Sequence, residues 1–209
     1  MHNESYKTVL KENTAELIEK KSRFIAAVMP AKTEQEALWF INKKKKEHYD
    51  ATHNTYAYVI RENNIARFSD DGEPGGTAGL PMMEVLKKEG LFDVVVVVTR
   101  YFGGTLLGAG GLVRAYSKSA KMGVDAAGIV TMITVKGYAI ECSYDVFGKV
   151  KYLIENNDYI LESIEYGEAV TVNVSVRTEH GDRFLKDIID VTNGAAVVKE
   201  TGENFVASK

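Results

Sequence analysis

The chain has 209 residues, 45% of them hydrophobic and 26% charged, a composition typical of a globular protein with one large or two small domains. Residues 1–130 carry 18 Lys and Arg against 16 Asp and Glu, whereas residues 131–209 carry 8 against 13, so charge alone does not indicate nucleic-acid binding. The single cysteine, Cys142, excludes an internal disulfide, and without a signal peptide or a stretch of about 20 apolar residues we expect a cytoplasmic protein with no membrane partner.

The first part of the chain is expected to form two strands and a helix. Residues 16–19 and 23–29 are extended runs joined by a short polar segment, so they are predicted to pair as neighbouring strands. Thr33 is a candidate N-cap with Glu36 three residues later, and the helix that follows reaches four lysines at residues 43–46. These lysines suit the C-terminal end of a helix dipole; a solvated end is the simpler interpretation, and a contact with RNA or phosphate is the alternative.

A β-hairpin is expected next. Residues 53–60 alternate as a strand does, and residues 62–64 form a turn into a second strand at residues 65–68. His53, at the start of the hairpin, is a candidate acid, base or ligand because its side chain titrates near neutral pH. A structural hydrogen bond is the alternative role.

An acidic loop follows the hairpin. Asp70, Asp71 and Glu73 place three carboxylates within four residues, and Gly72 and Pro74 enforce a turn. These carboxylates are candidates for acid–base chemistry or for holding a divalent cation, with capping of the turn as the simpler alternative. Because the loop lacks the alternating ligands and the distal glutamate of a calcium-binding loop, no metal site is predicted.

The central part of the chain is expected to be a helix followed by a buried strand. Residues 77–88 are predicted to be helical, with Pro81 tolerated in the first turn. Residues 94–98 are five consecutive valines without polar alternation, which is typical of a strand buried on both faces.

A second glycine-rich segment joins that strand to a helix predicted at residues 112–126. Free backbone N–H groups at such a helix start favour an anion such as phosphate. The glycine spacing is not that of a P-loop, and Val113 replaces the third glycine of a dinucleotide-binding motif. The candidate anion- or RNA-binding residues of this segment are Arg100, Tyr101, Gly103, Gly104, Gly108, Gly110 and Gly111.

The predicted helix carries a basic face. Arg114, Lys118 and Lys121 are spaced to share one side, next to the glycine-rich segment, so they are further candidates for contacting phosphate. A solvated face is the alternative. Tyr101 and Phe102 are candidates for stacking on bases, with a place in the core as the alternative.

The last third of the chain is predicted to be a separate module. Strand-like segments at residues 134–142, 159–166, 168–177 and 195–199 are interleaved with helical segments at residues 145–156 and 180–191. This βαββαβ order is that of a ferredoxin-like fold. We therefore expect an α+β protein with one domain at residues 1–130 and another at residues 134–209.

The two glycine-rich segments resemble the signatures of the YigZ/IMPACT family. The resemblance covers residues 70–81 and 99–114, and it extends to residues 21–25 and 53–58. It implies a first domain similar to domain 2 of ribosomal protein S5 and a ferredoxin-like second domain similar to an elongation factor module. Eukaryotic relatives regulate translation with an additional N-terminal domain, which we do not expect here.

Two functions remain open on the sequence alone. The favoured one is a non-catalytic protein that binds nucleic acid or the ribosome in the regulation of translation, with RNA or a ribosome and a phosphate-like anion as partners. The alternative is an enzyme acting on a small phosphorylated or peptide substrate, with its acidic loop, and His53 as proton carrier, beside a glycine-rich anion-binding turn. No nucleophile with a matched base is evident, and no cofactor is expected.

Overall fold

The computed structural model describes residues 5–208 and is a mixed α+β structure built on antiparallel sheets. None of the helices in this described part is long and apolar enough to cross a membrane. The strands are β1 (Tyr6–Val9), β2 (Asn13–Glu19), β3 (Ser22–Pro30), β4 (His53–Ile60), β5 (Ile65–Ser69), β6 (Val94–Tyr101), β7 (Ile129–Cys142), β8 (Ile160–Tyr166), β9 (Val170–Arg177) and β10 (Val197–Ala207). The α-helices are α1 (Glu34–Glu47), α2 (Gly79–Glu89), α3 (Ala109–Ala127), α4 (Tyr144–Glu155) and α5 (Gly181–Thr192).

Contacts divide the chain into two compact units. One is Tyr6–Thr131, and the other consists mainly of Met132 and the described residues that follow it. Their buried residues form separate clusters, two in the first unit and one in the second. That the units fold independently, as domains 1–130 and 134–209, stays a prediction.

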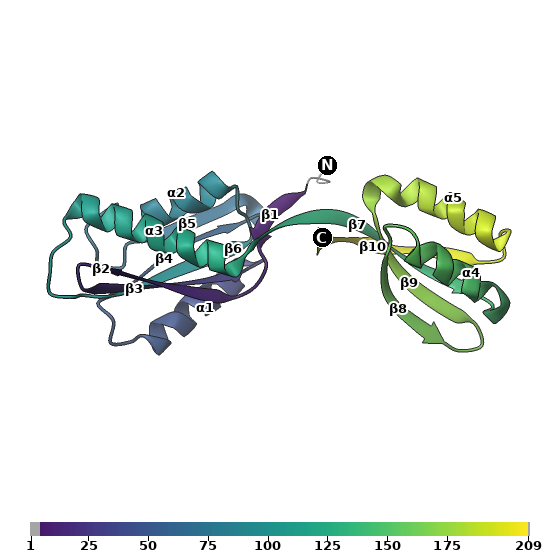
Figure 1. Cartoon of the computed structure of the whole chain (residues 1–209), viewed down its shortest axis with the longest axis horizontal. Coiled ribbons are helices and arrows are strands. Elements are labelled where there is room, and N and C mark those ends of the chain that lie inside the picture. Colours follow the sequence, from purple (N-terminus) through teal and green to yellow (C-terminus); the bar gives the residue numbers. More distant parts are fainter. Residues whose placement is uncertain (1–4, 209) are drawn as a thin grey trace. The chain divides into compact units, whose positions relative to one another are not determined.

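The first unit is a five-stranded antiparallel sheet in the order β2-β3-β6-β4-β5 (Figure 1). Helices α2 and α3 pack on one face and α1 packs on the other. The central strand β6 contributes Val94, Val96 and Val98 to the first cluster, and Val95 and Val97 to the second. The prediction of a valine strand buried on both faces is therefore confirmed.

Local signals place most elements of this unit correctly. Thr33 caps α1, because its hydroxyl accepts a hydrogen bond from the Glu36 N–H at 3.2 Å. Pro81 lies in the first turn of α2, where no intrahelical donor is lost. Helix α3 begins three residues earlier than predicted, because Gly108 makes the turn at φ 72° and the next two glycines are already helical.

The second unit is built on β7, β8, β9 and β10 with α4 and α5. Strand β9 lies between β7 and β8, and β10 pairs with the other side of β7. The alternating valines at positions 170, 172, 174 and 176 are all buried, in one cluster with Phe184 and Ile188. Strand β7 starts five residues before the predicted strand, since Gly128 ends α3 at φ 75° and the chain is extended from Ile129.

The separate cores predict a localised response to a core mutation. Phe184→Ala removes a fully buried ring from the cluster of the second unit, at a cost of about 3–5 kcal/mol. Amide hydrogen exchange in β9 should become faster, whereas exchange in β3 and β6 should stay unchanged. Equal acceleration in both units, measured by mass spectrometry, would show that the two cores unfold together.

Candidate functional site

Asp70 organises the backbone of the acidic loop. Its Oδ2 accepts a hydrogen bond from the Gly76 N–H at 2.8 Å, and its Oδ1 accepts from the N–H groups of Ala78 at 3.0 Å and Gly79 at 2.8 Å. These donors lie at the start of α2, where backbone N–H groups have no intrahelical partner. Asp70 therefore acts as a cap that folds the loop onto the helix.

Asp71 ties the same loop to β4 and α1. Its carboxylate accepts hydrogen bonds from the Asn54 N–H at 2.7 Å and from Lys45 Nζ at 2.8 Å. Its main-chain carbonyl lies 2.8 Å from Nδ1 of His53. Because a carbonyl can only accept, Nδ1 of His53 carries the hydrogen and Nε2 points toward Glu73.

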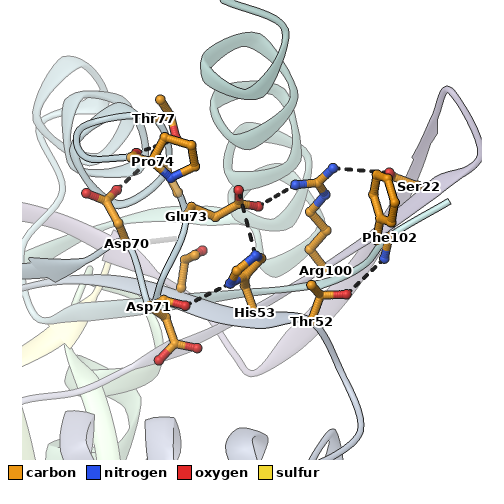
Figure 2. A network of polar contacts seen from close by, with 12 residues as sticks. Ser22, Thr52, His53, Asp70, Asp71, Glu73, Pro74, Thr77, Arg100 and Phe102 are labelled. Atoms are coloured by element: carbon orange, nitrogen blue, oxygen red, sulfur yellow. Dashed lines mark hydrogen bonds and ion pairs between the residues drawn. The ribbon is translucent and has the colours of Figure 1, made fainter. Parts of the chain in front are cut away.

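Glu73 is the buried centre of the region (Figure 2). Its Oε1 lies 2.6 Å from Nη1 of Arg100 and accepts a hydrogen bond from the Tyr116 hydroxyl at 2.7 Å. Its Oε2 is 3.8 Å from Nε2 of His53. Burial and then the Glu73 carboxylate raise the pKa of Tyr116, so the hydroxyl stays protonated and keeps donating.

Arg100 completes this network and is itself buried. Its Nη2 lies 3.3 Å from the Ser22 hydroxyl, and its Cζ lies 5.4 Å from the ring centroid of Phe24 and 5.6 Å from that of Phe102. Only 5% of the residue is exposed. Arg100 was expected to contact phosphate from the sequence, but in the structure its charge is neutralised by Glu73 inside the unit.

The three carboxylates of the acidic loop do not converge. Asp70 faces backbone N–H groups, Asp71 faces β4 and α1, and Glu73 faces Arg100. Among residues 5–208 there is no group of three or more His, Cys, Asp or Glu side chains placed to hold a metal ion. The contacts that these acids make are those of loop closure and of the pairing with Arg100.

Gly103 lets the end of β6 pack against the turn between β2 and β3. A Cβ atom built on Gly103 would lie 2.0 Å from the carbonyl carbon of Lys21, and the Gly103 N–H donates to Ser22 Oγ at 3.2 Å. The turn itself places Lys20 and Lys21 at φ 46° and 67°. The close approach thus fixes a two-residue turn that carries two lysines beside the glycine-rich segment.

A small pocket lies between this turn and the start of α3. Its volume is about 240 Å³, and three of the residues that line it are cations: Lys20, Arg114 and Lys118. None of these three forms an ion pair with another described residue, whereas Glu19 adds one carboxylate to the lining. The lining is completed by Leu17, Leu107, Gly111 and Ala115.

The other predicted binding residues have different surroundings. The Tyr101 hydroxyl contacts His48 and Asp50 at 3.0 and 3.1 Å, and Lys121 forms ion pairs with Asp125 and Glu89. Phe102 is 47% exposed. Gly104 and Gly108 both adopt positive φ angles with open space around them, and Gly110 and Gly111 form the first turn of α3.

The basic end of α1 is mostly neutralised. Lys43 and Lys44 form ion pairs with Glu12, and Lys45 pairs with Asp71. Lys46 is exposed and has no ion pair among residues 5–208. These contacts support the interpretation of this end as a solvated, structural part of the helix.

Sequence reasoning missed Lys20 and Tyr116. Lys20 was taken only as part of a polar link, although the two strands on either side define a two-residue hairpin turn whose position follows from the pattern. Tyr116 was not among the predicted site residues, and its hydrogen bond to a carboxylate 43 residues earlier has no local signal in the sequence. The first residue was accessible to sequence analysis and the second was not.

The glycine contact predicts a steric effect at one position. Gly103→Ala forces the Cβ into the backbone of the β2–β3 turn and should lower the free energy of unfolding by about 2–3 kcal/mol. Gly75→Ala, in the acidic loop with nothing within 4 Å of the added atom, is the matched control and should change it by less than about 0.5 kcal/mol. Urea denaturation measures both, and equal losses would contradict the steric assignment.

The buried ion pair predicts a coupled effect. Glu73→Leu leaves the Arg100 guanidinium buried without its partner and should cost about 3–5 kcal/mol. The double variant Glu73→Leu with Arg100→Met removes both charges and should be more stable than Glu73→Leu alone. Strictly additive losses in urea denaturation would show that the two side chains do not depend on each other.

Comparisons with known proteins agree with the family resemblance of the two glycine-rich segments. Residues 20–124 match the family model of the Impact N-terminal domain, and residues 140–195 match a domain of unknown function, DUF1949. The IMPACT family member YvyE of Bacillus subtilis (strain 168) is 44% identical over 197 residues, which cover 94% of this chain and 91% of that protein. The IMPACT family member YigZ of Escherichia coli (strain K12) is 31% identical over 179 residues, which cover 84% and 88%.

A solved structure is similar to this chain over most of its length. It is described as the crystal structure of a hypothetical protein, is 30% identical, and aligns with a TM-score of 0.61 over 93% of this chain and 96% of that one. The two family models that match this chain and the two relatives above 30% identity over most of both chains point to one conclusion. The chain belongs to the IMPACT family.

Proposed function

We propose that this protein is a non-catalytic nucleic-acid- or ribosome-binding protein linked to the regulation of translation, and that it binds RNA phosphates at the pocket between the β2–β3 turn and α3. The observation that supports the proposal is the set of three cations, Lys20, Arg114 and Lys118, that line one pocket and form no ion pair with any other residue that the structure describes. Unpaired Lys and Arg side chains can neutralise RNA phosphates, and the counterions that are then released from the RNA supply the electrostatic part of the affinity. The family resemblance supplies the link to translation.

The same proposal includes the two finer fold assignments, a first unit similar to domain 2 of ribosomal protein S5 and a ferredoxin-like second unit. The second assignment is supported by the βαββαβ order from β7 to β10 and by the place of β9 between β7 and β8, which is a split βαβ arrangement. Likeness of fold alone does not carry function. The pocket therefore remains the basis of the proposed role.

The enzyme alternative has less support from the geometry. It requires acidic side chains that are free to act on a substrate, but Asp70, Asp71 and Glu73 all have protein partners at 2.6–3.0 Å. His53 is also engaged, through Nδ1 and through its approach to Glu73. A group whose charge and hydrogen bonds are already taken up by the fold is poorly placed for acid–base work.

The binding proposal predicts a salt-dependent loss. The triple variant Lys20→Ala, Arg114→Ala, Lys118→Ala should bind single-stranded RNA or purified ribosomes more weakly, and the slope of log affinity against log salt should become shallower by roughly 0.7 for each phosphate contact that is lost. Fluorescence anisotropy across a salt series measures affinity and slope together. Circular dichroism verifies that the variant is folded.

The matched control removes the same charge from elsewhere in the first unit. Lys32, Lys46 and Lys88 are exposed lysines without ion pairs in the described part of the chain, so their triple alanine variant also loses three positive charges. Its affinity and slope should stay close to wild type. If both triple variants lose affinity equally, binding follows net charge and the pocket has no special role.

A further inference from the structure

We propose that the pocket lined by Lys20, Arg114 and Lys118 takes a phosphomonoester, the terminal phosphate of an RNA 5′ end or of a free nucleotide, and not the internal phosphodiesters of a strand. This inference rests on the proposed function, since it specifies which phosphate the pocket would hold. Three features carry it: the charge of the lining, the size of the pocket, and the pairing of the neighbouring cations.

The charge of the lining suits a dianion. Three cations and the single carboxylate of Glu19 leave two net positive charges around the pocket. A phosphomonoester carries about −1.5 to −2 at neutral pH, whereas each internal phosphodiester carries only one negative charge. Arg114 can in addition offer two parallel N–H groups to a phosphate, which a lysine cannot do.

The pocket is small and partly apolar. At about 240 Å³ it is below the range of roughly 300–1,000 Å³ that is typical of sites for drug-sized ligands. Leu17, Leu107 and Ala115 contribute apolar surface to its lining. Such a space fits a compact head group and disfavours a strand that passes through it.

Two of the cations near the pocket are engaged by other side chains, and Lys21, beside Lys20 in the turn, is not among the residues that line the pocket. Further along α3, Lys121 forms ion pairs with Asp125 and Glu89, and at the end of β6 Arg100 is buried against Glu73. A site for the backbone of single-stranded RNA needs a positively charged groove that follows several phosphates. Among the described residues, the unpaired cations at this place are the three in the lining and the adjacent Lys21, and such a compact cluster suits one phosphate group better than a run of several.

The turn that carries Lys20 is held in place by its contact with Gly103. The backbone of Lys21 is in close contact with Gly103, and both lysines of the turn adopt positive φ angles. Lys20 is therefore presented by a fixed backbone opposite Arg114 and Lys118, which come from a regular helix. Cations carried by a fixed backbone lose less freedom on binding a single small anion than cations on a mobile loop would.

The test compares RNA oligomers of identical sequence with a 5′-monophosphate or a 5′-hydroxyl, using the full-length protein and fluorescence anisotropy. We expect the 5′-phosphorylated oligomer to bind roughly tenfold more tightly, because of the additional charge-assisted contacts. The Lys20, Arg114 and Lys118 triple alanine variant should lose this difference, and the Lys32, Lys46 and Lys88 variant should keep it. AMP should compete for the site, whereas adenosine should not.

The variant Glu19→Gln is an independent test, in which affinity should increase and not decrease. Removing the one carboxylate from the lining should strengthen binding of the 5′-phosphorylated oligomer several-fold, because a repulsive charge is lost. Weaker binding would contradict an anion site. Inorganic phosphate serves as the smallest competitor, and its competition would support recognition of the phosphate group itself.

The possible outcomes separate this inference from the proposed function. Equal affinity for both oligomers, with dependence on the three cations retained, would overturn the terminal-phosphate inference and leave RNA binding intact. Binding of AMP without binding of either RNA would support the phosphomonoester site and overturn the RNA proposal. Absence of binding by RNA, AMP and inorganic phosphate at millimolar concentration would overturn both.

Discussion

The first unit depends on one buried carboxylate. Glu73 comes from a loop with little regular structure, yet it contacts β6 through Arg100 and α3 through Tyr116, and it lies against His53 of β4. A charged group inside a protein is costly unless it is paired and hydrogen-bonded, so the loop can bury Glu73 only where all of these partners are present. Arg100 in turn reaches Ser22, at the start of β3, and so the loop, the sheet and α3 are held in one arrangement.

Aspartate and glycine residues allow the backbone around Glu73 to pair its N–H groups and to pack closely. Asp70 satisfies the N–H groups at the start of α2, and Gly79 approaches the backbone of Ser69 so closely that a Cβ would lie 2.8 Å from its oxygen. Gly103 does the same for the end of β6 against Lys21. The family signature is thus explained mainly by close packing and loop closure, and the pocket beside it is formed as a consequence of that packing.

The sequence was sufficient for features whose cause is local. The valines of β6, the cap at Thr33 and the alternating valines of β9 each follow from the residue pattern and have the predicted environment. The start of α3 was placed too late, because glycines usually disfavour helices and only the φ angle of Gly108 shows where the turn ends.

Charged residues were harder to interpret, since their roles depend on partners far away in the chain. Nothing near Glu73 in the sequence indicates that it pairs with a residue 27 positions later. Lys121 and Lys118 were predicted on the same face of the helix, yet within residues 5–208 only Lys121 forms an ion pair. Local sequence thus gives the positions of charges, and the tertiary structure decides which of them remain available.

The β2–β3 turn has a further consequence for the evolution and engineering of this protein. A two-residue turn with both residues at positive φ is best served by Asn-Gly, whereas Lys20 and Lys21 each cost roughly 1–2 kcal/mol in that conformation. Replacing them with Asn-Gly would relax the hairpin and remove a cation from the pocket in the same step. Selection for thermal stability alone would therefore favour loss of Lys20, and a variant chosen only for its melting temperature would lose part of the positive charge around the pocket.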